Sequence, residues 1–138
     1  MKWADQLIKL SNFEVELLQK RLSEIVERRV LAEMKLAVLV AEGEAELQRA
    51  REDAQAGWYH AGFAQGLKLR KAAAQAAIDE AAAEEEGARD ALAQAFETLK
   101  KYEQVAENAR YAAVKEEGRR ETAALDEIGL RRAASGGR

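Results

Sequence analysis

The feature that most constrains this chain is an apolar residue at every third or fourth position, with no proline to interrupt the pattern. Proline in a helix interior costs about 3 kcal/mol or more, so this chain of 138 residues can run as helix over most of its length. A heptad-like apolar seam requires a partner helix to cover it. The sequence therefore predicts long helices that pack lengthwise against one another.

Two such seams can be followed along the chain. The first contains Ile8, Ser11, Val15, Leu18, Leu22, Ile25, Arg29, Ala32, Leu36 and Leu39. The second contains Leu67, Lys71, Ala74, Ile78, Ala81, Glu85, Ala88, Leu92, Ala95, Leu99, Tyr102, Ala106, Ala109 and Ala113. Residues 72–95 include twelve alanines. Because alanine buries little area, we expect the alanine-rich half of the pairing to open more easily than the half near the termini.

The two seams are separated by a stretch rich in glycine and aromatic residues, from Gly57 to Leu67. Glycine costs about 1 kcal/mol in a helix interior and suits a helix end. The predicted fold is all-α: a long antiparallel two-helix coiled-coil hairpin. Its first arm covers about residues 4–58, its tip about 57–68 and its second arm about 68–132, and residues 133–138 form a flexible tail.

A fold-back near residue 67 predicts the register of the hairpin. Facing residues would then have numbers that sum to about 135, as in the pairs Leu36 and Leu99, Leu39 and Phe96, and Leu22 and Ala113. A shift by one heptad would also be tolerated. A third helix that begins near Asp90, after a break at Gly87, is a further alternative.

Composition excludes several classes of function. The net charge of -3 gives no overall positive field for nucleic acid. The chain has no cysteine and a single histidine, His60, so we expect neither a zinc site nor another metal site. No phosphate-binding glycine loop is present, and we expect no cofactor and no enzymatic activity. No apolar run approaches the length of about 20 residues that a membrane-spanning helix needs.

The tip carries the most distinctive side chains. Three aromatic residues, Trp58, Tyr59 and Phe63, precede a basic group formed by Lys68, Arg70 and Lys71. Exposed aromatic residues are favoured anchors for protein contacts, so one interpretation is a docking surface for an acidic partner. In the other interpretation, the aromatic residues plug the end of the hairpin and the basic residues balance surface charge.

Several segments together resemble the FliJ family of flagellar export proteins, in the form found in alphaproteobacteria. The resemblance covers nearly the whole chain. It is carried by Phe13-Glu14-Val15-Glu16, Leu18-Gln19-Lys20-Arg21-Leu22, Glu33-Met34-Lys35-Leu36, Gly57-Trp58-Tyr59, Gly62-Phe63, Leu99-Lys100-Lys101-Tyr102-Glu103 and Arg119-Arg120-Glu121.

The resemblance implies a stalk-like coiled coil in the cytoplasm, at the cytoplasmic face of the inner membrane, which binds the hexameric export ATPase and couples it to the membrane export gate. The family's gate-contacting surface includes a Phe followed four residues later by a Leu, and Phe63 and Leu67 match that spacing. Further export-machine partners left open are an ATPase regulator and export chaperones. The implied gate-contacting residues are Trp58, Tyr59, Phe63, Leu67, Lys68, Arg70 and Lys71. The implied ATPase-contacting residues, at the end that carries both termini, are Leu18, Arg21, Arg28, Arg29, Arg119 and Arg120.

Two other functions fit parts of the same pattern. A structural or adaptor coiled coil of another ATPase or secretion system would share the seam without needing an aromatic tip. A helix that lies on a lipid surface fits less well, because such helices favour Lys and Arg on the polar face. The chain would be peripheral to a membrane at most.

Overall fold

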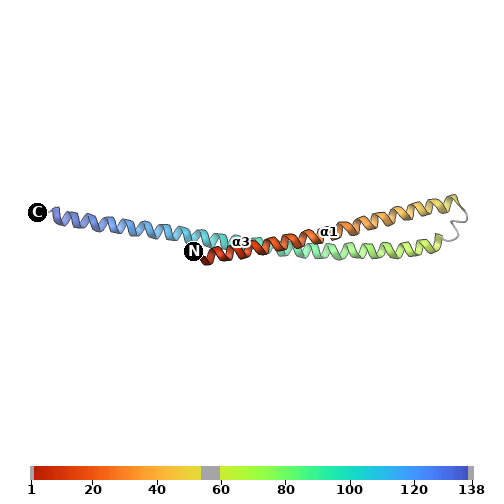
Figure 1. The fold of residues 1–138 in the computed structure, drawn as a ribbon, viewed down its shortest axis with the longest axis horizontal. Helices are drawn as coiled ribbons and strands as arrows, with labels where there is room; N and C mark the ends of the chain where they lie inside the picture. Colours follow the sequence, from red (N-terminus) through yellow and green to blue (C-terminus); the bar gives the residue numbers. More distant parts are fainter. Residues whose placement is uncertain (1, 54–59, 137–138) are drawn as a thin grey trace. The chain divides into compact units, whose positions relative to one another are not determined.

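A computed structural model describes residues 2–53 and 60–136, and within these ranges the chain consists of two α-helices (Figure 1). Helix α1 spans Lys2–Glu52 and helix α3 spans His60–Gly136. Asp5 lies in the first turn of α1, and Arg49 and Arg51 lie in its last turn, so their charges complement the helix dipole. The helices pack together as a hairpin without strands in the described ranges, which confirms the all-α prediction.

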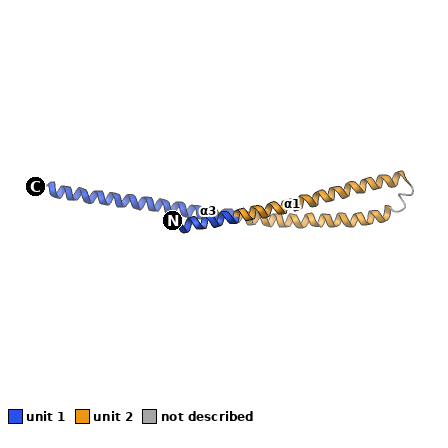
Figure 2. Cartoon of the chain, in the orientation of Figure 1, with its two compact units in different colours: residues 1–14, 95–138 blue, residues 15–94 orange. Residues whose placement is uncertain are grey.

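The chain divides into two compact units, each of which contains a piece of both helices (Figure 2). One unit comprises Val15–Gln94, and the other comprises Met1–Glu14 with Ala95–Arg138. The core of the first unit is formed by Val15, Ile25, Leu39, Leu67, Ala74, Ala81 and Ala88. The buried residues of the second unit are Ala4, Ser11, Ala95, Leu99 and Ala106.

Both predicted seams are the buried surfaces of their helices. Every predicted seam position of α1 from Ile8 to Leu39 is buried or half-buried, and the same holds on α3 from Leu67 to Ala109. Only the last predicted position, Ala113, is exposed. The periodicity therefore identified the contact faces correctly, since three- and four-residue steps select one side of a helix.

The predicted register was wrong. Arg29 contacts Glu85 across the two helices, and their residue numbers sum to 114, which is 21 residues, or three heptads, below the expected sum of about 135. Leu36 accordingly packs near Leu67 and Ala74 instead of facing Leu99. The predicted pairs of Leu39 with Phe96 and Leu22 with Ala113 fail for the same reason.

The error arose from where α3 begins. Residues 60–68, which were assigned to the tip, are helical because α3 begins at His60. Glycine costs only about 1 kcal/mol in a helix interior, and Gly62 and Gly66 are both accommodated within α3. The helix also runs without a break through Gly87, so no third helix begins near Asp90, and it reaches Gly136, four residues into the predicted tail.

Candidate functional site

Phe63 lies on the first turns of α3 and is covered on two sides. Its half-buried side chain packs against the cluster of Leu39, Leu67 and Ala74. The guanidinium carbon of Arg70 lies 5.8 Å from the centroid of the Phe63 ring, within the range of a cation–π contact. Phe63 therefore contributes to the packing of the hairpin while part of its ring remains accessible to a partner.

Leu67 is a core residue and not an exposed anchor. Its side chain is only 8% exposed, and it fills the space above Gly43, where an added Cβ would lie 2.5 Å from the Leu67 Cδ2 atom. This burial agrees with the place of Leu67 in the predicted second seam. Because α3 already begins at His60, Leu67 lies two helical turns inside the pairing.

A groove opens between the helices beside Leu67, with a volume of about 390 Å³. It is lined by Val40, Gly43, Glu44, Leu47, His60, Ala64, Leu67, Lys68 and Lys71. The Nδ1 atom of His60 is buried there without a hydrogen-bond partner in the described residues. Lys68 and Lys71 form no ion pair within residues 2–53 and 60–136, so an apolar groove with a basic edge is available. Two predicted tip residues, Trp58 and Tyr59, lie outside the described residues.

The predicted ATPase-contacting residues belong to both compact units, with Leu18, Arg21, Arg28 and Arg29 in one and Arg119 and Arg120 in the other. Arg28 pairs with Glu84 and Arg29 with Glu85. Arg119 and Arg120 both pair with Glu116 of their own helix. Leu18 is half-buried in the seam, and Arg21 is exposed beside a groove that also contains Ile25 and Glu84.

Arg29 and Glu85 form the centre of a charged network inside the seam. The Arg29 Nε atom lies 2.7 Å from a Glu85 carboxylate oxygen, and the side chains of Arg29 and Glu85 are 26% and 12% exposed. Arg29 also pairs with Glu33, and Arg89 pairs with Glu85. The hydrogen bond from Arg29, followed by that from Arg89, lowers the pKa of Glu85, whereas its partial burial opposes this effect.

Residues 110–136 of α3, here called the C-terminal segment, have no covering helix. Apart from half-buried Glu116, every residue of this segment is exposed. Large apolar side chains are among them, namely Tyr111, Val114, Leu125, Ile128 and Leu130. The predicted register paired Ala113 with Leu22, so it implied that α1 covers this segment. Steps of three and four from Tyr111 through Val114 to Leu125 and Ile128 would have revealed the stripe.

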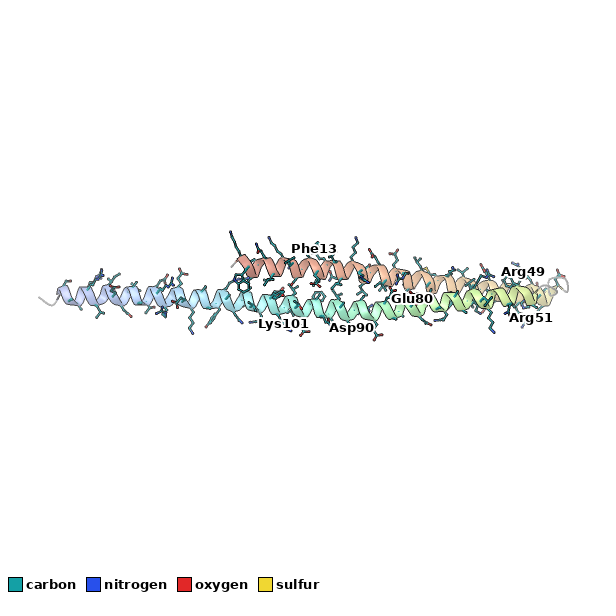
Figure 3. The ribbon with its side chains drawn as sticks, turned by 90° about the horizontal axis from the view of Figure 1, so that it is seen from below. Phe13, Arg49, Arg51, Glu80, Asp90 and Lys101 are labelled. Atoms are coloured by element: carbon teal, nitrogen blue, oxygen red, sulfur yellow. The ribbon has the colours of Figure 1, made fainter. Side chains whose placement is uncertain are left out.

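Helix α1 also carries apolar residues on the face opposite its seam, here called the outer stripe. It consists of Leu10, Phe13, Leu17, Leu31, Met34 and Val38, each more than half exposed. Phe13 points away from α3 (Figure 3). These residues also follow steps of three and four, so the sequence contained this second signal, which the search for a single seam did not use.

Two further features, a metal site and a membrane-spanning stretch, are absent from the described residues. Among residues 2–53 and 60–136, no group of three His, Cys, Asp or Glu side chains is placed to hold a metal ion. Neither helix, over its described length, contains a stretch apolar enough to cross a membrane.

Comparison with known proteins shows clear similarity to two curated proteins. The chain is 54% identical over 137 residues, covering 99% of both sequences, to a protein of Caulobacter vibrioides strain NA1000 named "Flagellar FliJ protein". The protein of the same name from the CB 15 strain matches to the same extent. No family model and no solved structure matches the chain.

Proposed function

Because this chain belongs to the FliJ family of flagellar export components, we propose that it is the stalk-like subunit that links the export ATPase to the membrane export gate. The observation that carries the proposal is the similarity along 99% of both sequences. We place the protein in the cytoplasm, at the cytoplasmic face of the inner membrane, as a binding protein without enzymatic activity.

The end of the hairpin is the proposed contact for the export gate. The surface consists of Trp58, Tyr59, Phe63, Lys68, Arg70 and Lys71. Leu67, which is buried against Gly43, supports this surface from within. The apolar groove with Lys68 and Lys71 at its edge favours a partner that offers an apolar side chain next to acidic residues.

The proposed ATPase contact centres on Arg119 and Arg120 in the C-terminal segment. This segment leaves apolar residues such as Tyr111 and Val114 exposed, and exposed apolar residues flanked by charge are suited to protein contacts. Leu18, Arg21, Arg28 and Arg29 belong to the proposed ATPase contact as well. Among these, Arg21 and Arg28 are exposed on α1.

The proposal is tested by ATP hydrolysis with purified proteins. The chain alone should hydrolyse no ATP, and it should raise the hydrolysis rate of the cognate export ATPase. The double charge reversal Arg119→Glu/Arg120→Glu should reduce that stimulation. Lys100→Glu/Lys101→Glu, an exposed pair on the same helix, is the matched control. Absence of any stimulation and of any complex with the ATPase would refute the ATPase contact.

The gate contact is tested separately by binding to the cytoplasmic part of the gate protein. Lys68→Glu/Lys71→Glu should weaken binding while leaving the helical content unchanged, because neither lysine is ion-paired within the described residues. Lys100→Glu/Lys101→Glu again serves as control. Equal binding by both variants would show that Lys68 and Lys71 take no part in the gate contact.

A second candidate function is supported by the outer stripe on α1. Its exposed apolar residues, such as Leu31 and Met34, are suited to a scaffold or adaptor that holds another helix. Light scattering separates the two functions in part, because a scaffold built on this stripe would associate into larger species, whereas a stalk subunit would remain a single hairpin until its partners are added.

A further inference from the structure

The alanines in the seam of the Val15–Gln94 unit are interchangeable under a slide of seven residues. On α3, alanine recurs every seven residues at Ala74, Ala81 and Ala88, and these residues are only 5%, 1% and 8% exposed. If α3 moved by one heptad along α1, each alanine would occupy the place of its neighbour. Uniform small residues pack closely but do not specify one register. Something other than the alanines must therefore fix the pairing.

Arg29 and Glu85 are charged residues within this seam that contact each other between the helices, and the more exposed Arg28 and Glu84 pair beside them. Each occupies a seam position of its helix, and the Arg29 Nε atom lies 2.7 Å from a carboxylate oxygen of Glu85. Glu33 on α1 and Arg89 on α3 complete the network. A polar group at one seam position of a coiled coil is an attested means of specifying register.

A slide in either direction would separate this pair and place both charges on apolar side chains. In the first slide, Arg29 would face Ile78 and Glu85 would face Leu22. In the second slide, in the opposite direction, Arg29 would face Leu92 and Glu85 would face Leu36. Charged groups that lose their partner in a partly buried place lose the compensation for their desolvation. The charged pair therefore opposes both slides.

The contact between Gly43 and Leu67 makes the two directions unequal. Leu67 fits above Gly43 because that position lacks a Cβ atom. The first slide would press Leu67 against Leu36, and overpacking of this kind is destabilising. The second slide would place Leu67 opposite Ala50, where a small side chain leaves room. The Gly43–Leu67 contact therefore opposes the first slide alone, whereas the Arg29–Glu85 pair opposes both.

The second slide would require a longer connection between the two helices, and the first residues of α3 can supply the added length. It would separate residues 60–66 from α1, and this first part of α3 contains Gly62 and Gly66. A Cβ at either glycine would meet nothing within 4 Å, so neither is tied to a close contact. Because glycine weakens a helix, these residues can leave the helix more readily than the rest of α3.

We propose that the Arg29–Glu85 pair is a register lock, which holds the hairpin in the observed pairing and whose loss allows α3 to slide by one heptad along α1, with residues 60–66 passing into the loop. The lock concerns the pairing of the two helices and does not depend on the function proposed above.

The absence of cysteine allows the register to be read directly by crosslinking in the full chain. Ala32 lies three residues after Arg29, and Ala81 lies four residues before Glu85, so Ala32→Cys with Ala81→Cys reports the observed register. Ala32→Cys with Ala88→Cys reports the second slide. A short bismaleimide or a disulfide joins only cysteines that face each other. With Arg29 and Glu85 intact, we expect crosslinking in the first reporter pair and a trace in the second.

Three sets of substitutions are then compared in both reporters. Arg29→Leu/Glu85→Leu should raise crosslinking between residues 32 and 88 relative to 32 and 81 by about tenfold or more, a ratio that corresponds to about 1.4 kcal/mol. The exchanged pair Arg29→Glu/Glu85→Arg should retain the observed register. Arg28→Leu/Glu84→Leu, which removes the neighbouring exposed pair, is the matched control and should also retain it.

A second variant covers the case in which the leucine variant does not fold. Arg29→Gln/Glu85→Gln removes both charges but keeps polar side chains with good helix propensity, and it should show the same shift. Circular dichroism establishes that each variant is helical. Crosslinking only between residues 32 and 81 in the helical uncharged variants would overturn the proposal, as would an equal shift in the Arg28→Leu/Glu84→Leu control.

Discussion

At the scale of single residues, Glu85 links charge to stability. Its carboxylate accepts hydrogen bonds from Arg29 across the seam and from Arg89 on its own helix, and these bonds lower its pKa. A carboxyl group with a lowered pKa stabilises the folded state while it is ionised. That contribution is complete above the pKa of the unfolded chain and disappears as the pH falls through the pKa of the folded state.

Acidification should therefore weaken the hairpin through Glu85. We expect the thermal midpoint to fall as the pH drops below about 4.3, the ordinary pKa of glutamate. Glu85→Gln should be less stable than the unaltered protein at pH 7, and the difference should narrow towards pH 3. The exposed Glu80 provides the control Glu80→Gln, which should follow the unaltered protein. A constant difference between pH 3 and pH 7 would contradict the role given to Glu85. Circular dichroism melts at each pH provide the measurement.

Gly43 and Gly87 are both helical but should respond in opposite ways to alanine. At Gly87 a Cβ would meet nothing within 4 Å, whereas at Gly43 it would collide with Leu67. Gly87→Ala should stabilise the protein by about 0.5–1 kcal/mol, the usual gain from replacing glycine in a helix. Gly43→Ala should lose that gain, because Leu67 has to move. Urea unfolding of the two variants measures the difference, and equal stabilisation would exclude the close packing of Leu67 on position 43.

At the scale of the helices, α1 has two apolar faces with different roles. The seam face contains Leu39, which is 6% exposed, whereas the outer stripe contains Phe13, which is 59% exposed. Leu39→Ala should cost about 2 kcal/mol or more, since it removes buried apolar contacts. Phe13→Ala should change the stability by less than about 0.5 kcal/mol, as is usual for surface positions. Chemical unfolding of both variants is the measurement, and a large loss for Phe13→Ala would mean that a partner or a second copy covers the outer stripe.

The C-terminal segment is held together by contacts within one helix. Arg119 pairs with Glu116, and Arg131 pairs with Glu127, spacings that each add only a few tenths of a kcal/mol to a helix. A stop codon after Ala109 should therefore lower the helical signal but leave the midpoint of the main unfolding transition nearly unchanged. A marked fall of that midpoint would show that the segment takes part in the pairing.

At the scale of the whole molecule, the sequence was sufficient to predict the contact faces but not the register. Apolar spacing alone determines which side of α1 and α3 is buried, and nearly every position followed it. Register depends instead on the residue at which the second helix begins, and alternative starting residues differ little in free energy. Gly62 and Gly66 weaken a helix only slightly, so the register is determined by the packing of Leu67 and by the Arg29–Glu85 pair. Those are long-range contacts, which no local pattern contains.

Some features of the candidate sites follow from the local sequence, whereas others depend on the register. The basic group at Lys68 and Lys71 was found because its residues are neighbours in sequence. The exposure of the C-terminal segment was missed because it is a consequence of register, and the burial of Leu67 was missed because the predicted tip was too long. A search for several apolar stripes on each helix would have found the outer stripe as well.

The last covered position of α3, Ala109, has a consequence for how the protein is made. A ribosome synthesises the chain from its N-terminus, and domains generally form as their residues emerge. All residues of the seam precede the C-terminal segment, so the two helices can begin to pair while the final residues are still being added. The exposed part of α3 is thus the part that the ribosome synthesises last, after the residues that pair with α1.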